Sequence, residues 1–316
     1  MPCPGYKEYD PSSNHHPSSY STVMKRLQQD ALTLANILAE HPRLVVLTGA
    51  GISHDSGIPT YRDQRGTWLH SKPIQEQAFL SDESTRRRYW ARSWFGWPVM
   101  RDAFPNPAHV ALAQLEQCGS IELVITQNVD RLHQCAGSRN VVDLHGRVDQ
   151  VRCLNCDALH PRDSIQGLLK KQNPWLSAVQ SNHLARPDGD MEVPEDIFHA
   201  LSLPKCHNCS GDLMPNVVFF GGSVPPARVS TCLDALDKAD ALIAIGSSLM
   251  VFSGYRFCRR ASQLGKPVVI INPGITRADN LAHVKLQSPA GPLLTRAIEH
   301  INQGQRLKPS AHDNPR

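Results

Sequence analysis

The stretch LVVLTGAGIS, residues 44–53, carries most of the information about the architecture of this 316-residue chain. Its first five residues are uncharged and mostly apolar, which predicts a short strand buried on both faces. Gly49 and Gly51 then end the strand in a turn whose backbone N–H groups have no side chain in front of them. A pyrophosphate can approach such a turn closely, so the stretch predicts a strand that leads into a nucleotide-binding loop.

The same alternation of apolar runs and amphipathic segments continues along the chain. Helical spacing predicts helices at 22–40, 75–95, 107–118, 226–238, 254–264 and 291–302. Apolar runs predict further strands at 121–126, 141–142, 241–245, 268–271 and 283–286. Strands that are apolar along their whole length indicate an α/β fold, a parallel sheet with helices on both faces. Ligands of such sheets bind beyond the carboxyl ends of the strands, where the following loops converge.

A different composition interrupts this pattern in the middle of the chain. Residues 147–215 are polar, weakly periodic and rich in Cys and Pro, which predicts a small inserted module. The sheet domain is then formed by residues 21–146 and 216–302. The polar ends of the chain, 1–20 and 303–316, are predicted to be a disordered and a flexible tail.

Two CxxC pairs mark the inserted module. Cys153 and Cys156 form the first pair, and Cys206 and Cys209 form the second. Each pair presents two thiolates to one tetrahedral ion, so the two pairs saturate a zinc site, and a saturated site is structural rather than catalytic. Redox-active or unpaired thiols are the alternative, which two matching pairs in a chain without a secretory start do not favour.

The composition excludes several classes of protein. A hydrophobic fraction of 41%, a charged fraction of 20% and a net charge of +4 are ordinary for a globular protein. No segment reaches the roughly 18 consecutive apolar residues of a membrane span, so we expect no membrane partner. Residues 1–20 have neither a basic start nor an apolar core, and we expect a cytoplasmic protein. Scattered basic residues predict no direct contact with nucleic acid, and nothing requires more than a monomer.

The glycine loop differs from the dehydrogenase fingerprint. That fingerprint needs a third glycine at the position of His54, so hydride transfer is the weaker interpretation. Two further strands end in Gly246-Ser247-Ser248 and Asn272-Pro273-Gly274. Their hydroxyl, amide and backbone groups suit ribose and adenine, and three such loops at strand ends indicate one nucleotide site.

Two polar segments contain the candidate catalytic groups. Thr126-Gln127-Asn128-Val129-Asp130 ends the predicted strand at 121–126, and Leu144-His145-Gly146 precedes the first cysteine pair. A histidine between a strand end and a glycine can reach a site without heavy packing, and the polar segments around it set His145 apart. His109 and His133 are interpreted as surface or core residues.

These motifs together resemble the sirtuin family, in family order, from about residue 40 to residue 300. The resemblance rests on residues 49–53, 57–62, 126–130, 144–146, 215–221 and 246–248 together with the four cysteines. Residues 91–98, 187–190 and 252–257 further resemble the class II branch, which includes a mitochondrial member with lipoamidase, deacylase and ADP-ribosyltransferase activities. The chain departs from the usual family pattern at Thr60-Tyr61, Asn216 and Gly222.

The resemblance implies a Rossmann-like NAD-binding domain and a role for individual residues. Catalysis is implied for His145, Asn128 and Asp130. Cofactor binding is implied for Gly49, Ala50, Gly51, Ile52, Ser53, Gly57, Ile58, Pro59, Tyr61, Arg62, Trp68, Gln127, Asn128, Val129, Asp130, Gly246, Ser247, Ser248, Asn272, Pro273, Gly274 and Ala290. Val217, Val218, Phe219 and Phe220 are expected to pair with the substrate backbone as an edge strand. NAD as co-substrate and one structural Zn²⁺ are the implied cofactors.

The implied activity is NAD-dependent deacylation of acyl-lysine proteins or peptides. Its products are nicotinamide, 2′-O-acyl-ADP-ribose and free lysine, with His145 deprotonating the ribose hydroxyls. Protein mono-ADP-ribosyl transfer or NAD hydrolysis in the same pocket is one alternative. A non-enzymatic NAD-sensing module, or a zinc-dependent nucleic-acid-binding module, is the other.

The acyl group is less well determined by the sequence. Tyr89 and Arg92 lie three apart on a predicted helix and resemble a pair with which some sirtuins hold an acidic acyl chain, the alternative being a surface pair. Trp90, Trp94, Phe95 and Trp97 either line an apolar acyl channel or pack in the core.

Overall fold

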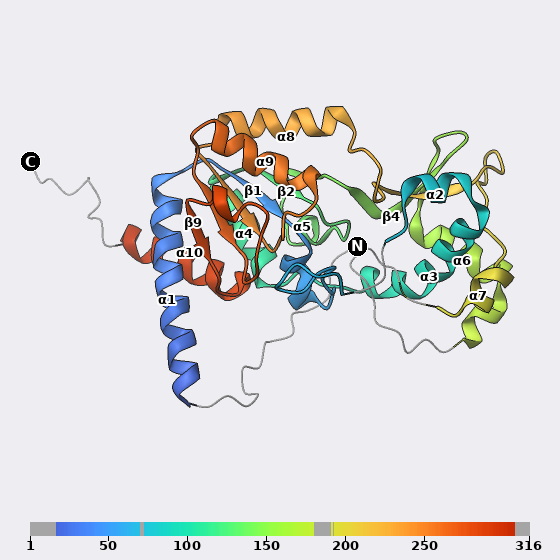
Figure 1. Ribbon diagram of the computed structural model, residues 1–316, viewed down its shortest axis with the longest axis horizontal. Coiled ribbons are helices and arrows are strands. Elements are labelled where there is room, and N and C mark those ends of the chain that lie inside the picture. Colours follow the sequence, from blue (N-terminus) through green and yellow to red (C-terminus); the bar gives the residue numbers. More distant parts are fainter. Residues whose placement is uncertain (1–16, 70–72, 180–190, 192, 307–316) are drawn as a thin grey trace, which may run out of the picture.

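A six-stranded parallel sheet forms the centre of the larger domain in the computed structural model, which describes residues 17–69, 73–179, 191 and 193–306 (Figure 1). The strand order is β3-β2-β1-β7-β8-β9, and every pairing is parallel. The strands are β1 (Leu44–Thr48), β2 (Ile121–Thr126), β3 (Val141–Asp143), β7 (Ala241–Ile245), β8 (Val268–Ile271) and β9 (Val284–Leu286). The predicted parallel α/β fold is confirmed.

Helices cover both faces of this sheet because its strands are apolar on both faces. Val46, Val124 and Ile243 belong to the core cluster beneath α1 (Pro17–Glu40), α4 (Pro107–Gln117) and α10 (Ala290–Arg306). Their chain neighbours Val45 and Leu242 belong to the opposite cluster, beneath α8 (Pro226–Lys238) and α9 (Phe252–Gln263). Successive side chains of a strand point to opposite faces, so both faces need a helical cover.

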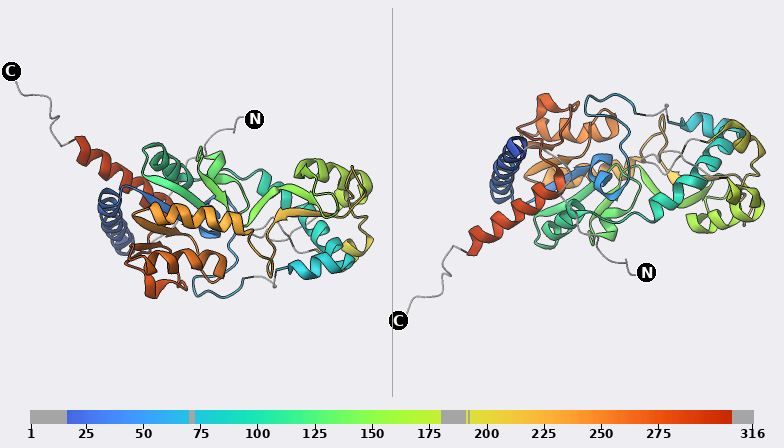
Figure 2. Two further views of the ribbon diagram at one scale, coloured as in Figure 1. Left: turned by 90° about the horizontal axis from the view of Figure 1, so that it is seen from above. Right: turned by 90° about the horizontal axis from the view of Figure 1, so that it is seen from below.

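The smaller domain is built on an antiparallel sheet of order β5-β4-β6. Its strands are β4 (Gly146–Cys153), β5 (Leu159–Pro161) and β6 (Leu213–Val217), and its helices include α6 (Arg162–Gln172), η2 (Pro174–Ala178) and α7 (Glu195–Ala200). The views of Figure 2 place these elements at the opposite end of the molecule from α1 and α10.

The structure extends the smaller domain beyond the predicted range 147–215. The predicted helix at 75–95 is two helices, α2 (Glu76–Ser81) and α3 (Glu83–Arg101), which pack beside α6 and α7 rather than on the parallel sheet (Figure 1). Asp82 separates them, since its carboxylate caps α3 by accepting hydrogen bonds from Ser84 N and Thr85 N. Trp90 anchors α3 through its indole N–H, which donates to the Leu213 carbonyl 3.3 Å away.

The ends of the chain differ slightly from the predicted tails. Helix α1 already begins at Pro17, and α10 continues to Arg306. The remaining tail residues, 1–16 and 307–316, and the class II segment 187–190 lie outside the described residues. Within the described part of the chain, no helix combines the length and apolarity needed to cross a bilayer.

Candidate active site

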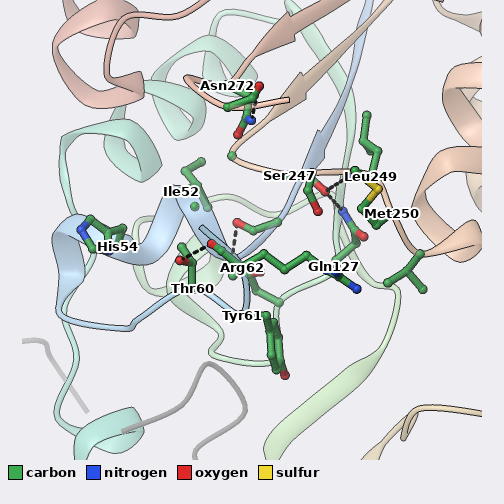
Figure 3. A pocket seen from close by; sticks show the side chains of 18 of the residues that line it. Ile52, His54, Thr60, Tyr61, Arg62, Gln127, Ser247, Leu249, Met250 and Asn272 are labelled. Atoms are coloured by element: carbon green, nitrogen blue, oxygen red, sulfur yellow. Dashed lines mark hydrogen bonds between the residues drawn. The ribbon is translucent and has the colours of Figure 1, made fainter. Parts of the chain in front are cut away.

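The loops at the carboxyl edge of the parallel sheet surround a cavity of about 580 Å³. The loops after β1, β2, β7 and β8 contribute to its wall (Figure 3). The end of β6 and Tyr89 of α3 line it from the side of the smaller domain. The predicted convergence of strand-end loops is therefore observed. A volume of this size lies within the usual range for small-molecule sites.

Close packing between two glycine turns shapes the floor of the cavity. The Gly51 N–H donates to the Gly246 carbonyl over 2.7 Å. A Cβ added to Gly49 or Gly51 would come within 2.8 Å of Ser247 Cβ or Gly246 Cα. These glycines are thus required by the contact between the loops after β1 and β7, and the turn after β1 continues as the short 3₁₀ helix η1 (Ala50–Ser56).

A hydrogen-bond network lies directly behind this floor. Ser53 Oγ donates to Asp130 Oδ2 over 2.7 Å and accepts a hydrogen bond from Asn128 Nδ2 over 3.0 Å. Asn128 Nδ2 also donates to the Gly49 carbonyl, 3.2 Å away. Burial raises the pKa of the Asp130 carboxyl, while the hydrogen bonds from Leu132 N–H and Ser53 oppose that shift. The network ties the loop after β2 to the glycine turn.

Two buried histidines extend this network into the core. His109 Nε2 lies 3.4 Å from Ser53 Oγ, and His133 Nε2 lies 2.9 Å from Thr48 Oγ1. Burial lowers the pKa of His133 to about 4 and that of His109 well below its ordinary value. Both are buried, so of the two interpretations, surface or core residue, the second is correct.

His145 is held at both ring nitrogens. Its Nδ1 lies 2.9 Å from the Gln127 carbonyl oxygen, and its Nε2 lies 2.8 Å from Ser253 Oγ. Burial is the largest cause that lowers the pKa of His145 to about 4; the bond to Gln127 opposes the shift, and the charges of Arg228 and Arg256 add to it. With a pKa this low the imidazole is neutral at pH 7, the form in which a histidine can accept a proton.

Most residues predicted to bind the cofactor line this one cavity. From the predicted set, the lining contains Gly49, Ala50, Gly51, Ile52, Tyr61, Arg62, Trp68, Gln127, Asn128, Val129, Gly246, Ser247, Ser248, Asn272, Pro273, Gly274 and Ala290. Figure 3 shows Gln127 directed at Ser247, whose Oγ accepts from Gln127 Nε2 over 2.8 Å.

Five predicted residues lie behind the wall instead of in it. Ser53 and Asp130 act through the network described above, and Gly57 ends η1 with a φ of 84°. Ile58 is buried in a core cluster with Trp97 and Val129. Pro59 is the fifth, and like the others it is absent from the cavity lining.

The sequence reasoning missed part of the cavity wall. Gln287, Ser288, Pro289 and Gly291 line it at the end of β9, and Met250, Val251 and Ile275 line it beside the predicted loops. Residues 287–291 follow the predicted strand at 283–286, just as the other lining loops follow their strands. The position of this loop after a strand was therefore the signal from which its place in the cavity wall could have been predicted.

The covering segment, residues 60–68 after η1, lines one side of the cavity with side chains that contact one another. The Arg62 guanidinium lies 3.8 Å from the centre of the Trp68 ring, and Arg62 Nη1 donates to the Gly66 carbonyl over 2.7 Å. Tyr61 and Trp68 both contact the Phe220 ring edge-on. These contacts join the covering segment to the end of β6.

The predicted substrate residues are divided between the cavity and the domain core. Val217, Val218, Phe219, Phe220 and Tyr89 line the cavity. The strand itself ends at Val217, and the Phe220 carbonyl already accepts a hydrogen bond from Glu76 N–H over 2.8 Å. The predicted free edge is thus partly covered by the start of α2.

Arg92 does not reach the cavity. It is buried, and its Nε donates to the Met191 carbonyl over 3.0 Å. Of the neighbouring aromatic residues, Trp90 and Trp97 are buried around Arg162, whose guanidinium lies 5.3 Å and 5.4 Å from their rings. Core packing is therefore the correct interpretation for both tryptophans.

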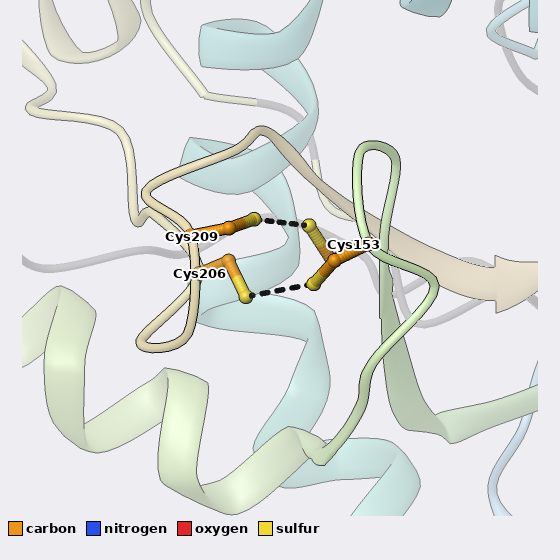
Figure 4. A group of neighbouring side chains, drawn as sticks. Cys153, Cys206 and Cys209 are labelled. Carbon is orange, nitrogen blue, oxygen red and sulfur yellow. Dashed lines mark hydrogen bonds between the residues drawn. The ribbon is translucent and has the colours of Figure 1, made fainter.

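Four cysteines from two loops form a compact cluster in the smaller domain (Figure 4). The sulfur atoms of Cys153, Cys156, Cys206 and Cys209 all lie within 4.8 Å of one another. Cys153 and Cys209 are 3.5 Å apart, and Cys156 and Cys206 are 3.8 Å apart. The edge of a zinc tetrahedron with 2.3 Å Zn–S bonds is about 3.8 Å, so the donor set fits one zinc ion. Four thiolates leave no open coordination position, and the site is structural.

This arrangement, in which strand-end glycine loops and a buried histidine line one cavity, is that of a nucleotide-dependent enzyme. The Sir2 family sequence model matches residues 49–253, and the chain belongs to the Sir2 family, the sirtuins. The predicted cofactors, NAD and one structural zinc ion, agree with this family and with the four-cysteine cluster.

Relatives from bacteria and animals match nearly the whole chain. The "NAD-dependent protein deacetylase" of Xanthomonas axonopodis pv. citri is 49% identical over 265 residues, 84% of this chain and 90% of its own. The "NAD-dependent protein deacylase Sirt4" of Drosophila melanogaster is 41% identical over 300 residues, 94% of this chain and 92% of its own. A solved Sir2–p53 peptide–NAD⁺ complex has a TM-score of 0.69 and 30% identity, and covers 86% of this chain and 98% of its own.

Proposed function

We propose that the protein is an NAD-dependent protein-lysine deacylase that releases nicotinamide and 2′-O-acyl-ADP-ribose. The observation that carries the proposal is the position of His145. Its neutral imidazole lines the same cavity as the glycine turn after β1 and the residues at the end of β6. A base, a nucleotide loop and a peptide-side strand thus open into one space, as transfer of an acyl group from a peptide to a nucleotide requires.

Each wall of the cavity has its own part in this proposal. NAD supplies an activated ribose carbon. The loops after β1 and β7 bind its phosphates and ribose, with the hydroxyls of Ser247 and Ser248 as donors in the cavity wall. Asn128 presents its amide to the nicotinamide side, held by Ser53 and Gly49. His145 takes the proton of a ribose hydroxyl, and Arg62 with Trp68 keeps water away from the reacting atoms.

The substrate side supports a peptide with an acyl-lysine, in line with the peptide complex among the related structures. The acyl chain would lie along Tyr89 and Phe219, whose rings contact each other edge-on with their centres 5.4 Å apart. Both residues line the cavity, and the site offers the chain an aromatic wall. An acidic acyl chain held by Arg92 requires that Arg92 turn from the Met191 carbonyl toward the cavity. The test compares the turnover of glutaryl peptides with that of hexanoyl peptides in wild type and in Arg92→Ala. The same ratio in both proteins would contradict a role for Arg92 in binding the acyl group.

A product assay with matched histidine variants tests the proposal. Wild type, His145→Ala and His283→Ala are each incubated with NAD and acyl-lysine peptides, and the products are identified by mass. His283 is the control because it is exposed and far along the chain, at the start of β9. We expect acyl-ADP-ribose from wild type and His283→Ala and its loss in His145→Ala.

The same assay separates the alternatives. If no acyl-ADP-ribose forms, a modified acceptor protein would indicate ADP-ribosyl transfer, and free ADP-ribose would indicate NAD hydrolysis. NAD binding without any release of nicotinamide would indicate a non-enzymatic NAD sensor. We further propose a monomer in the cytoplasm that acts on proteins and not on nucleic acid, which sedimentation and fractionation of cells would test.

A further inference from the structure

The first turn of α9 contacts two residues of the cavity wall, Gln127 after β2 and His145 after β3. Ser253 Oγ lies 2.8 Å from His145 Nε2. The next residue, Gly254, lies so close to the Gln127 side chain that an added Cβ would be 2.6 Å from Gln127 Oε1. The amino-terminal end of α9 thus packs against His145 and against Gln127, whose carbonyl holds the other side of the same imidazole.

The hydroxyl of Ser253 is not used to cap its own helix. Serine near a helix start usually accepts a hydrogen bond from a backbone N–H of the first turn. The N-cap of α9 is Val251, and α9 has no side-chain cap hydrogen bond. The Ser253 hydroxyl is instead hydrogen-bonded to His145, a residue distant in the sequence.

The direction of this hydrogen bond follows from the other ring nitrogen. A carbonyl oxygen only accepts hydrogen bonds, so the Gln127 carbonyl at 2.9 Å fixes the proton of the neutral imidazole on Nδ1. Nε2 then carries the lone pair, and Ser253 O–H must be the donor. The atom of His145 that can accept a proton is therefore the atom that Ser253 contacts.

We propose that Ser253 is a positioning residue for the reaction, whose hydroxyl binds the Nε2 lone pair of His145 and fixes the imidazole until a ribose hydroxyl takes the place of the serine hydroxyl. The inference rests on the proposed role of His145 as base. With Nδ1 bound to Gln127 and Nε2 bound to Ser253, the ring has no freedom to rotate about χ2, so the base is fixed before substrate arrives. Once the ribose hydroxyl has taken the place of the serine hydroxyl, the only further step at the base is the transfer of a proton from the ribose oxygen to Nε2.

The same contact affects the proton affinity of the base. The charged groups whose fields reach His145 are Arg228 of α8 and Arg256 of α9, and both disfavour the imidazolium. The positive end of the α9 dipole, at Ser253, acts in the same direction. A hydroxyl that donates to Nε2 also favours the neutral ring, and its removal therefore raises the proton affinity.

Four variants test the role of Ser253. Ser253→Ala removes the donor, and Ser253→Thr keeps a hydroxyl at the same carbon. Ser262→Ala is the matched control, an exposed serine in the last turn of the same helix. His145→Ala reports on the proposed base itself. The readouts are kcat and KM for NAD across pH, and titration of the His145 imidazole by NMR in the absence of substrate.

We expect Ser253→Ala to lower kcat about tenfold, the size of one hydrogen bond at the reacting group, with KM for NAD unchanged. The pKa of its imidazole should rise by about one unit, and the midpoint of the acid limb in the pH profile of kcat should move up by the same amount. Ser253→Thr should restore both, and Ser262→Ala should match wild type.

An unchanged kcat and an unchanged imidazole titration in Ser253→Ala would overturn the inference. Lower activity that Ser253→Thr does not restore, with no shift of the imidazole titration, would overturn it as well. Full turnover by His145→Ala would instead refute the proposed base, which separates the two failures.

Discussion

Replacement of Gly246 by alanine measures how far the NAD site depends on the contact between two glycine turns. Gly246 follows β7 with a φ of 62°, and an added Cβ would lie 2.3 Å from the backbone nitrogen of Ile52. Ordinary contacts of a Cβ begin at 3.4 Å, so the turn after β1 must move by roughly 1 Å. The left-handed conformation itself costs alanine about 1–2 kcal/mol.

Gly265 provides the control for the conformational cost alone. It has a φ of 68°, but no heavy atom lies within 4 Å of its added Cβ. Gly265→Ala should therefore lower the free energy of unfolding by about 1–2 kcal/mol and leave turnover unchanged. Gly246→Ala should lose more stability, and its kcat/KM for NAD should fall about 100-fold, because a displacement of about 1 Å at a reacting site has an effect of that size.

The assay is denaturant unfolding of both variants together with initial rates at varied NAD. The stability difference between the two variants isolates the steric part, since both share the left-handed backbone. If both variants keep wild-type kcat/KM, or lose it equally, the close contact between the turns does not position NAD, and the reasoning fails.

Three further predictions concern the buried polar groups and the metal site. Removal of zinc by a strong chelator should lower the melting temperature and release one ion per chain; a chelator-resistant melting temperature would contradict a structural role. Thr48→Val should destabilise the protein by about 1–3 kcal/mol because it leaves His133 Nε2 without its partner, whereas exposed Thr231→Val should stay within about 0.5 kcal/mol; equal effects would refute this. His133 and His145 have pKa values of about 4 in the folded protein, compared with 6.5 in the unfolded chain. Between pH 4 and pH 6.5 the unfolded chain therefore binds more protons than the folded protein. Their contribution to stability is complete above pH 6.5 and is lost as the pH falls toward 4, and urea unfolding at pH 7 and pH 5 should show that loss.

The elements of the parallel sheet could be predicted from the sequence because their pattern is local. The limits predicted for β7, β8 and α8 agree with the structure. Pro226 begins α8 where a missing N–H costs nothing, and the strands are apolar on both faces. The glycine turns and the four cysteines were predicted for the same reason, since spacing along the chain defines them.

The composition of the smaller domain could not be predicted in the same way. Its sheet pairs Gly146 with Val217, residues far apart in the sequence, and these short strands are only partly apolar. The aromatic residues of α3 are equally compatible with packing on either domain. The contact of Trp90 with the Leu213 carbonyl, which assigns α3 to the smaller domain, is invisible until β6 is placed.

The division between the two domains also explains why NAD binding was easier to predict than acyl preference. The predicted cofactor residues that line the cavity come from loops of the parallel sheet and the segment that covers them. The proposed acyl side consists of Tyr89 and Phe219, which one helix and one strand end of the smaller domain bring together. Tyr89 and Arg92 share a helix, yet one lines the cavity and the other contacts Met191, because a separation of three residues still leaves about 60° between side chains around the axis. We therefore expect changes in α3 to alter the acyl preference without altering the affinity for NAD.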